Sequence, residues 1–174
     1  MDLKSKEDCN QIFFSNIKKI KEWCVEDIRD KNKNKIYFNT PLMYVPFGVE
    51  KDYNNYIIKL QFKGLKNNNK PEMKEFYNSI RNFENQIIDI KNVDKEKFKS
   101  QIIPKENYDD LLTIKINKKF HNIEIINQNS EIKNIFNIEK KSEIECKLHI
   151  DNLWDNGKII TTKFIVDKII IHET

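Results

Sequence analysis

Apolar and polar residues alternate along several separate segments of this 174-residue chain, and that alternation limits the folds it can adopt. In the segment 56–63, for example, Ile58 and Leu60 fall on one face of an extended chain, while Lys59 and Gln61 fall on the other. A period of two is typical of a strand with one face on a core and the other in solvent. Similar patterns predict further strands at residues 12–20, 35–39, 112–117, 123–127 and 144–151.

The segment 158–172 is long and mixed, which leaves open one strand that bends around a barrel corner or two short strands. Asn156-Gly157 precedes it and is typical of a β-hairpin turn, because both residues tolerate positive φ. Residues 21–30 fit either a short helix or an irregular hairpin.

One segment follows a different period. Between residues 72 and 90, apolar residues recur every three or four positions, and Pro71 stands just before them. This spacing predicts an amphipathic helix over residues 72–90, with the proline in or just before its first turn. A shorter helix is expected over residues 94–101, because the residue before Pro104 disfavours the helical conformation and would end it.

Together these elements predict a mainly β fold in which three strands, one helix and three or four more strands follow one another. We expect an OB-fold-like Greek-key barrel of five strands, with the amphipathic helix inserted between its third and fourth strands. The chain has no internal repeat and no linker-like segment, so residues 1–174 are expected to form a single domain of this type.

The charge of the chain is mildly basic and unevenly distributed. The formal net charge is +4, and residues 1–87 hold 16 basic against 12 acidic side chains, while residues 88–174 hold 15 of each. All of the excess positive charge therefore lies in the first half. Such a balance permits binding to nucleic acid or to an anionic lipid surface without requiring either.

Several classes of protein lack support in the sequence. Cys9, Cys24 and Cys146 show no CxxC spacing and predict reduced thiols rather than a disulfide framework or a zinc site. The glycines are isolated, the histidines lie far apart, and Asp109-Asp110 fits a turn better than a catalytic pair. No segment resembles a signal peptide or a membrane span. We therefore expect a soluble, intracellular, non-enzymatic protein without a metal or cofactor and without membrane contact.

Basic and aromatic residues are interleaved in three places: a basic loop before residue 37, the segment 44–63, and the predicted hairpin at residues 154–158. Cations that neutralise phosphates, beside rings that stack on bases, are what single-strand binding requires. The candidate nucleic-acid-binding residues are Lys33, Lys35, Tyr37, Tyr44, Tyr53, Tyr56, Lys59, Lys115, Trp154 and Lys158.

A structural interpretation of the same residues is that the lysines form an ordinary solvated face and the rings belong to the core. Trp154 could cap the barrel as easily as it could stack on a base. Phe47 directly follows Pro46, the second of two prolines that bracket the segment 41–46, and is expected in the core. Tyr44, between the two prolines, fits the core and the surface about equally.

Two motifs together resemble a known family. The segment 40–49, Thr-Pro-Leu-Met-Tyr-Val-Pro-Phe-Gly-Val, and the segment 153–158, Leu-Trp-Asp-Asn-Gly-Lys, are similar to parts of the single-stranded DNA-binding proteins of nucleocytoplasmic large DNA viruses. That family is in turn similar to an OB-fold replication protein of tailed phages. The resemblance extends over residues 12–171. It implies a protein that coats single strands in viral DNA replication, recombination or repair and contacts replication proteins.

The expected partner is single-stranded DNA. RNA is also left open, because a protein distinguishes the two by contacts to the 2′-hydroxyl, and these depend on the exact positions of side chains. A homo-oligomer is compatible with the sequence. The expected location is the host cytoplasm or viral factory, with the nucleus also open. The alternative function is a non-catalytic virion structural or protein-interaction β-domain.

Overall fold

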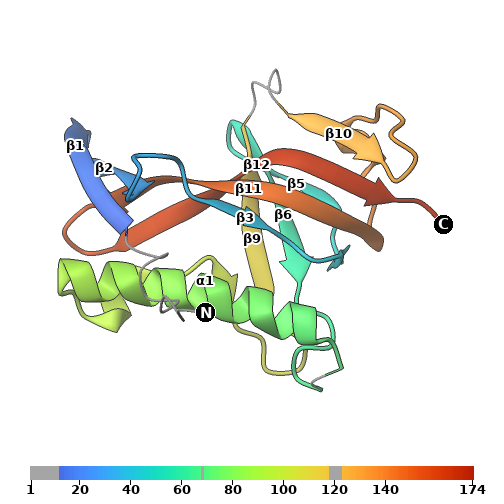
Figure 1. Ribbon diagram of the computed structural model, residues 1–174, viewed down its shortest axis with the longest axis horizontal. Coiled ribbons are helices and arrows are strands. Elements are labelled where there is room, and N and C mark those ends of the chain that lie inside the picture. The colour runs from blue at the N-terminus through green and yellow to red at the C-terminus, as the bar shows by residue number, and fades with distance from the viewer. Residues whose placement is uncertain (1–11, 68, 118–122) are drawn as a thin grey trace, which may run out of the picture.

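The computed structural model describes residues 12–67, 69–117 and 123–174 (Figure 1). Strands account for 48% of the structure, which confirms the mainly β prediction. The first strands are β1 (Ile12–Ile20), β2 (Trp23–Asp30), β3 (Tyr37–Asn39), β4 (Met43–Val45), β5 (Val49–Asp52) and β6 (Asn55–Gln61). The helix α1 (Pro71–Lys91), a 3-10 turn (Lys95–Lys97), β7 (Phe98–Lys99), β8 (Ile102–Ile103) and β9 (Leu111–Ile116) follow. The last elements are β10 (Glu124–Asn127), a second 3-10 turn (Ile135–Asn137), β11 (Ser142–Asp155) and β12 (Ile160–His172).

Five strands close into a barrel in the order β4, β6, β9, β12 and β11, and β11 pairs back with β4. Neighbours in this ring are antiparallel except β9 and β12, which run parallel. In Figure 1 the long pair β11 and β12 crosses the pair β6 and β9, as the walls of a small barrel do. The OB-fold-like Greek-key architecture is therefore confirmed.

The barrel interior is filled by the apolar face of each strand. Ile58 of β6, Ile114 of β9 and Phe164 of β12 have no exposed surface. Since successive side chains of a strand point to opposite sides, the residues between them point away from the core. This alternation is what places polar side chains together on the outside of the barrel.

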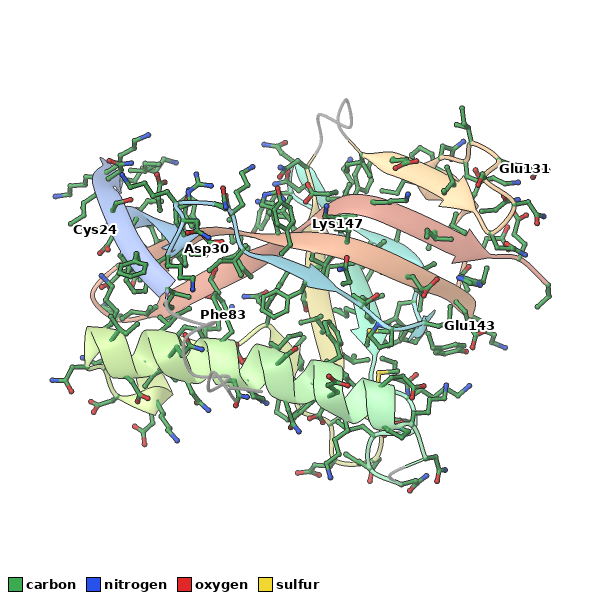
Figure 2. All side chains as sticks on the ribbon, in the orientation of Figure 1. Cys24, Asp30, Phe83, Glu131, Glu143 and Lys147 are labelled. Atoms are coloured by element: carbon green, nitrogen blue, oxygen red, sulfur yellow. The ribbon has the colours of Figure 1, made fainter. Side chains whose placement is uncertain are left out.

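Helix α1 packs its apolar face against the same core. Ile80 and Ile87 are fully buried, and the ring of Phe83 lies 5.6 Å from that of Phe38 in β3. Figure 2 shows Phe83 between the helix and the sheet. Pro71 occupies the first turn, where its missing N–H costs no hydrogen bond.

The predicted place of the helix in the strand order was wrong. Helix α1 lies between β6 and β9, which are the second and third strands of the barrel. The difference arises because two of the three strands predicted before the helix lie outside the ring. β1 pairs with β2 in a hairpin and β3 pairs with β11 outside the ring, while the short strand β4, which was not predicted, joins the ring. A period-two pattern identifies a strand but does not reveal its neighbours.

Three local predictions were also resolved. Residues 94–101 form one 3-10 turn and the extended segment β7, because β12 supplies partners for its backbone in place of helical bonds. Residues 21–30 form the turn and the second strand of a hairpin rather than a helix. The segment 158–172 contains one long strand, and irregular pairing with β11 lets it bend.

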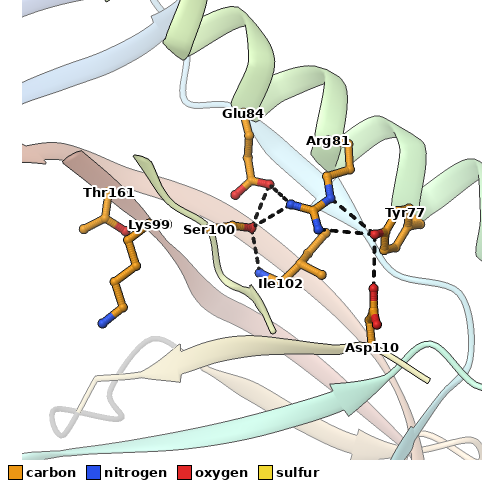
Figure 3. Close-up of polar contacts among 8 residues, drawn as sticks. All are labelled: Tyr77, Arg81, Glu84, Lys99, Ser100, Ile102, Asp110 and Thr161. Atoms are coloured by element: carbon orange, nitrogen blue, oxygen red, sulfur yellow. Dashed lines mark hydrogen bonds and ion pairs between the residues drawn. The ribbon is translucent and has the colours of Figure 1, made fainter. Parts of the chain in front are cut away.

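A partly buried polar network fixes residues 98–103 to the helix (Figure 3). Ser100 Oγ donates to Glu84 Oε1 at 2.9 Å and accepts from the backbone N–H of Ile102 at 2.9 Å. Arg81 Nη1 donates to the same Glu84 oxygen at 3.3 Å and to Ser100 Oγ at 3.2 Å. Burial, as the largest effect, raises the pKa of Glu84 above its ordinary value, against the opposing influence of Ser100 and Arg81.

Glu84→Gln is expected to change how stability depends on pH. Because the pKa of Glu84 is raised in the folded state, its contribution to stability is fully present below its unfolded pKa and is lost as pH rises through the folded pKa. The free energy of unfolding of the unmodified protein should therefore fall relative to that of the variant over this window. Urea unfolding at a series of pH values measures the difference, and Glu75→Gln on the exposed side of α1 is the control. Parallel pH profiles for the two proteins would contradict the expectation.

The described cysteines are free thiols. Cys24 is exposed on β2, Cys146 is buried on β11, and burial raises the pKa of the Cys146 thiol. Cys9 lies outside the described residues. No helix in the described part of the chain has the length and apolar character needed to cross a membrane.

Candidate nucleic-acid interface

One row of paired residues defines the outer face of the barrel. Ile57 on β6 pairs with Lys115 on β9, and Lys115 pairs with Ile165 on β12. Ile165 pairs with His149 on β11, which pairs in turn with Tyr37 on β3. Directly paired residues project from the same side of a sheet. These side chains therefore lie on one surface, although they come from widely separated parts of the sequence.

Two adjoining hollows on this outer face form a groove, which we call the tryptophan groove. Their volumes are about 580 and 80 Å³, and they share five lining residues, so they form one depression. The basic lining residues are Lys59, Lys99, Lys115 and Lys163. The other lining residues include Trp23, Trp154, Asp52, Gln101, Thr113 and Thr161.

Both tryptophans of the chain lie at one end of the groove. Trp23 comes from β2 and Trp154 from β11, and their ring centroids are 6.1 Å apart at an interplanar angle of 78°. The ammonium of Lys163 lies over the Trp154 ring, 5.1 Å from its centroid. Trp154 is half-buried, so the indole is held by neighbours and still borders the open hollow. Such a ring has the rigidity and the apolar surface that base stacking requires.

The lysines of the groove are close enough to affect one another. Burial is the largest cause that lowers the pKa of Lys163, and the charge of Lys115 lowers it further. Asp151 and Asp52 oppose this shift but do not cancel it. The groove thus holds two cations that repel each other in a partly desolvated place. A bound anion would relieve both the repulsion and the lost solvation.

Hydrogen bonds join two of the segments that line the groove, β12 and residues 99–101. Gln101 Nε2 donates to Thr161 Oγ1 at 3.0 Å, and Thr161 Oγ1 donates to the backbone oxygen of Lys99 at 2.8 Å. Figure 3 shows Lys99 and Thr161 beside Ser100, whose contacts with α1 are described above. The network around Glu84 therefore also positions this part of the groove.

Two further aromatic residues continue the outer face beyond β6. Lys59 lies over the ring of Phe47 at 5.6 Å, and Lys63 lies over the ring of Tyr44 at 4.7 Å. Phe47 is 46% exposed, so the expectation that it belongs to the core was wrong. Gly48 explains the difference: it has φ +72°, and a Cβ there would lie 3.3 Å from the backbone nitrogen of Lys140. The chain turns tightly at this glycine and carries Phe47 to the surface.

Phe47→Ala is expected to weaken single-strand binding without unfolding the protein, because nearly half of the ring is exposed. Loss of a partly exposed stacking ring should cost about 1 kcal/mol, or about fivefold in affinity. Fluorescence titration with oligo-dT measures the change. Phe136→Ala is the control. The Phe136 ring is 70% exposed, but it contacts Tyr56, whose side chain lies on the core side of β6, so it is not part of the outer face. Equal losses in the two variants would contradict a specific role for Phe47.

The structure brings some of the candidate residues together and separates others. Lys59, Lys115 and Trp154 line the tryptophan groove, while Tyr44 lies outside it on β4, with the ammonium of Lys63 over its ring. Tyr56 alternates with Ile57 and lies on the inner side of β6, packed partly against the core.

The other candidates lie around the periphery. Tyr37 is 48% exposed on β3 and has the ammonium of Lys147 over its ring at 4.6 Å; Figure 2 labels Lys147 on β11. Tyr53 is 93% exposed in the β5–β6 turn. Lys33 and Lys35 are exposed in the loop that follows β2, and Lys158 is exposed in the β11–β12 turn.

Sequence reasoning missed Lys163, Lys99 and Trp23 as lining residues of one site. Lys163 carried a usable signal, because it directly precedes Phe164 in the last strand, and alternation puts it on the face opposite that ring. Lys99 carried none, because its position depends on an extended segment where a helix was expected.

Solved structures with this architecture include two phage proteins. One is gp2.5, a single-stranded DNA-binding protein encoded by bacteriophage T7, with a TM-score of 0.56 and 12% identity over 80% of this chain and 87% of that one. The chain shares its fold. The other is the single-stranded DNA-binding protein of bacteriophage Enc34 in a C-terminally truncated form, with a TM-score of 0.54 and 11% identity. That alignment covers 92% of this chain and 94% of that one. No family model and no curated protein sequence matches the chain.

Proposed function

We propose that this chain is a non-enzymatic single-stranded DNA-binding protein that coats and protects single strands. The observation that carries the proposal is the tryptophan groove, in which both tryptophans and four lysines line one hollow on the outer face of an OB-fold-like barrel. Support also comes from two proteins of the same fold that are named as single-stranded DNA-binding proteins.

In the proposed mode of binding, the phosphates lie along Lys59, Lys115 and Lys163, and the bases turn toward the rings. Lys163 covers the face of Trp154 in the free protein. When DNA enters, a base takes the place of the ammonium on the indole, and the ammonium moves to a phosphate. The cation therefore keeps an interaction in both states, and a stacked base replaces a weaker cation–π contact.

This mode requires unpaired bases, because an aromatic ring cannot stack on the face of a base that lies within a duplex. Single-stranded RNA offers the same faces and phosphates, and Gln101, Thr113 and Thr161 provide polar groups that could contact a 2′-hydroxyl. We propose DNA as the natural ligand, and the test below compares it with RNA of the same length.

The biological setting belongs to the same proposal. The motifs at residues 40–49 and 153–158 resemble the single-stranded DNA-binding proteins of nucleocytoplasmic large DNA viruses, which supports a role in viral DNA replication, recombination or repair. The proposed location is accordingly the host cytoplasm or viral factory, with the nucleus as the alternative. Replication proteins and further copies of the chain are the proposed protein partners.

The test is a titration of labelled oligo-dT of about 30 nucleotides at several salt concentrations, against duplex DNA and RNA of matching length. We expect tight binding to the single strand, weaker binding to the duplex, and a linear fall of log K with log salt of about 0.7 per phosphate contact. Quenching of tryptophan fluorescence should accompany binding, because both indoles line the groove. Absence of binding at about 50 mM salt would refute the proposal.

One observation favours the alternative of a virion structural or protein-interaction domain. Ile132 and Phe136, in the segment after β10, are 90% and 70% exposed, as apolar residues of a protein-docking surface are. The same titration separates the two functions, since an interaction domain would leave oligo-dT unbound. The tryptophan groove has no role in that alternative.

A further inference from the structure

We infer that the β1–β2 hairpin and the loop after it form a second contact site for the same DNA strand, continuous with the tryptophan groove. This inference rests on the proposed function and assigns the direction in which the strand leaves the groove. The residues that carry it are Phe13, Arg29, Lys31 and Lys33, which we call the hairpin cradle.

Strand pairing places the cradle on the same face as the groove. Trp154 of β11 pairs with Val25 of β2, and Phe13 of β1 pairs with Arg29 of β2. Val25 and Arg29 are four positions apart on one strand, so their side chains project from the same side. Phe13 and Trp154 therefore share a face through their partners. The opposite side of β2 carries Ile28, which is buried in the core.

The cradle is a hollow of about 760 Å³ with an aromatic wall and a basic rim. Phe13 is 49% exposed, although it lies in a strand whose first residue, Ile12, is buried. Arg29, Lys31 and Lys33 line the same hollow. An exposed ring beside three cations repeats the combination found in the tryptophan groove, and it is the combination that binds bases and phosphates together.

The two carboxylates of the cradle shape it through hydrogen bonds. Asp30 Oδ1 accepts from the backbone N–H groups of Asn32 at 2.8 Å and Asn34 at 2.9 Å, and the loop turns at Lys33 with φ 65°. Asp27 Oδ2 accepts from Asn16 Nδ2 at 3.0 Å. Three cations outnumber these two carboxylates. The loop is thus organised before any ligand binds, which lowers the entropic cost of binding.

The distance between the two sites sets the length of DNA needed to reach both. Four residues along β2 span about 13 Å at about 3.3 Å per residue. A stacked strand rises about 3.4 Å per nucleotide, so about four nucleotides separate Trp154 from the cradle. A short oligonucleotide should therefore occupy the groove alone, while a longer one should contact both sites.

The experiment compares Lys33→Ala and Phe13→Ala with the unmodified protein on oligo-dT of about 5 and about 20 nucleotides. We expect unchanged affinity for the short oligonucleotide and about three- to tenfold weaker binding to the long one. For Lys33→Ala on the long oligonucleotide, the salt slope should also fall by about 0.7. Lys74→Ala, an exposed lysine on α1, is the matched control for lost charge. Thermal unfolding of each variant checks that the hairpin remains folded.

The outcomes separate this inference from the proposed function. Equal losses on both lengths, or a loss as large in Lys74→Ala, would overturn the cradle and leave groove binding intact. Unchanged affinity of both cradle variants for the long oligonucleotide would also overturn it. Failure of the unmodified protein to bind either length would refute the proposed function itself.

Discussion

Trp154→Ala is expected to lower the affinity for oligo-dT by about five- to a hundredfold, the effect of losing one stacked base at about 1–3 kcal/mol. The indole borders the open hollow and is flanked by Trp23 and Lys163, so its removal takes away the ring over which the Lys163 ammonium lies. Trp154→Phe keeps a stacking face and should lose about threefold or less. Titration by anisotropy measures both variants without relying on the indole signal.

The competing view is that Trp154 closes the end of the barrel and serves stability alone. Because Trp154 is half-buried, its replacement by alanine should lower the free energy of unfolding to some extent. Urea unfolding should therefore accompany each titration. If the folded fraction of Trp154→Ala binds DNA as tightly as the unmodified protein, the indole is a structural residue. A loss of affinity that the phenylalanine variant largely restores identifies a stacking residue.

The parts of the fold that the sequence predicts well are those decided by local burial. Ile58 and Leu60 on β6, and Ile80 on α1, reveal their element through the period at which apolar residues recur, because burial requires that period. The position of α1 between the second and third barrel strands could not be read in this way. It depends on β1 and β3 pairing outside the ring and on β4 joining it, which are properties of the whole topology.

The residues of the candidate site likewise fall into those that a local pattern identifies and those that only the topology brings together. Lys59 and Lys115 were identifiable because each alternates with buried residues within its own strand. Their proximity to Lys163 and Trp23 depends on closure of the barrel and on the β2–β11 pairing, which no local pattern specifies. Phe47 shows the opposite error: an apolar residue among apolar residues was assigned to the core, and one glycine turns it outward.

Lys163→Met is expected to weaken binding to oligo-dT by about tenfold and to lower the salt slope by about 0.7, because one phosphate contact is lost. The replacement keeps the length and apolar stem of the side chain, so the contact with Trp154 is preserved in part. Lys74→Met is the matched control, since Lys74 is exposed on α1 and does not line the groove. Equal effects of the two substitutions would show that only overall charge matters.

The pH dependence of Lys163 gives the same residue a second, independent signature. Because burial and Lys115 lower its pKa in the free protein, raising the pH neutralises Lys163 before an ordinary lysine. DNA affinity should therefore fall in this window, and Lys163→Arg should abolish that fall because arginine keeps its charge.

The free energy of unfolding should change in the opposite direction to the affinity. A folded-state pKa below the unfolded value means that charged Lys163 destabilises the free protein, so its free energy of unfolding should rise as pH passes through the lowered pKa.

Lys163→Met should accordingly raise the melting temperature of the free protein while it weakens DNA binding. A cation that lowers stability in the absence of ligand and increases affinity in its presence is typical of a binding site, where function opposes stability. If the lysine served only the fold, its replacement would lower both the melting temperature and the DNA affinity. Thermal unfolding of the unmodified protein and of Lys163→Met, each with and without oligo-dT, therefore distinguishes the two roles of this residue.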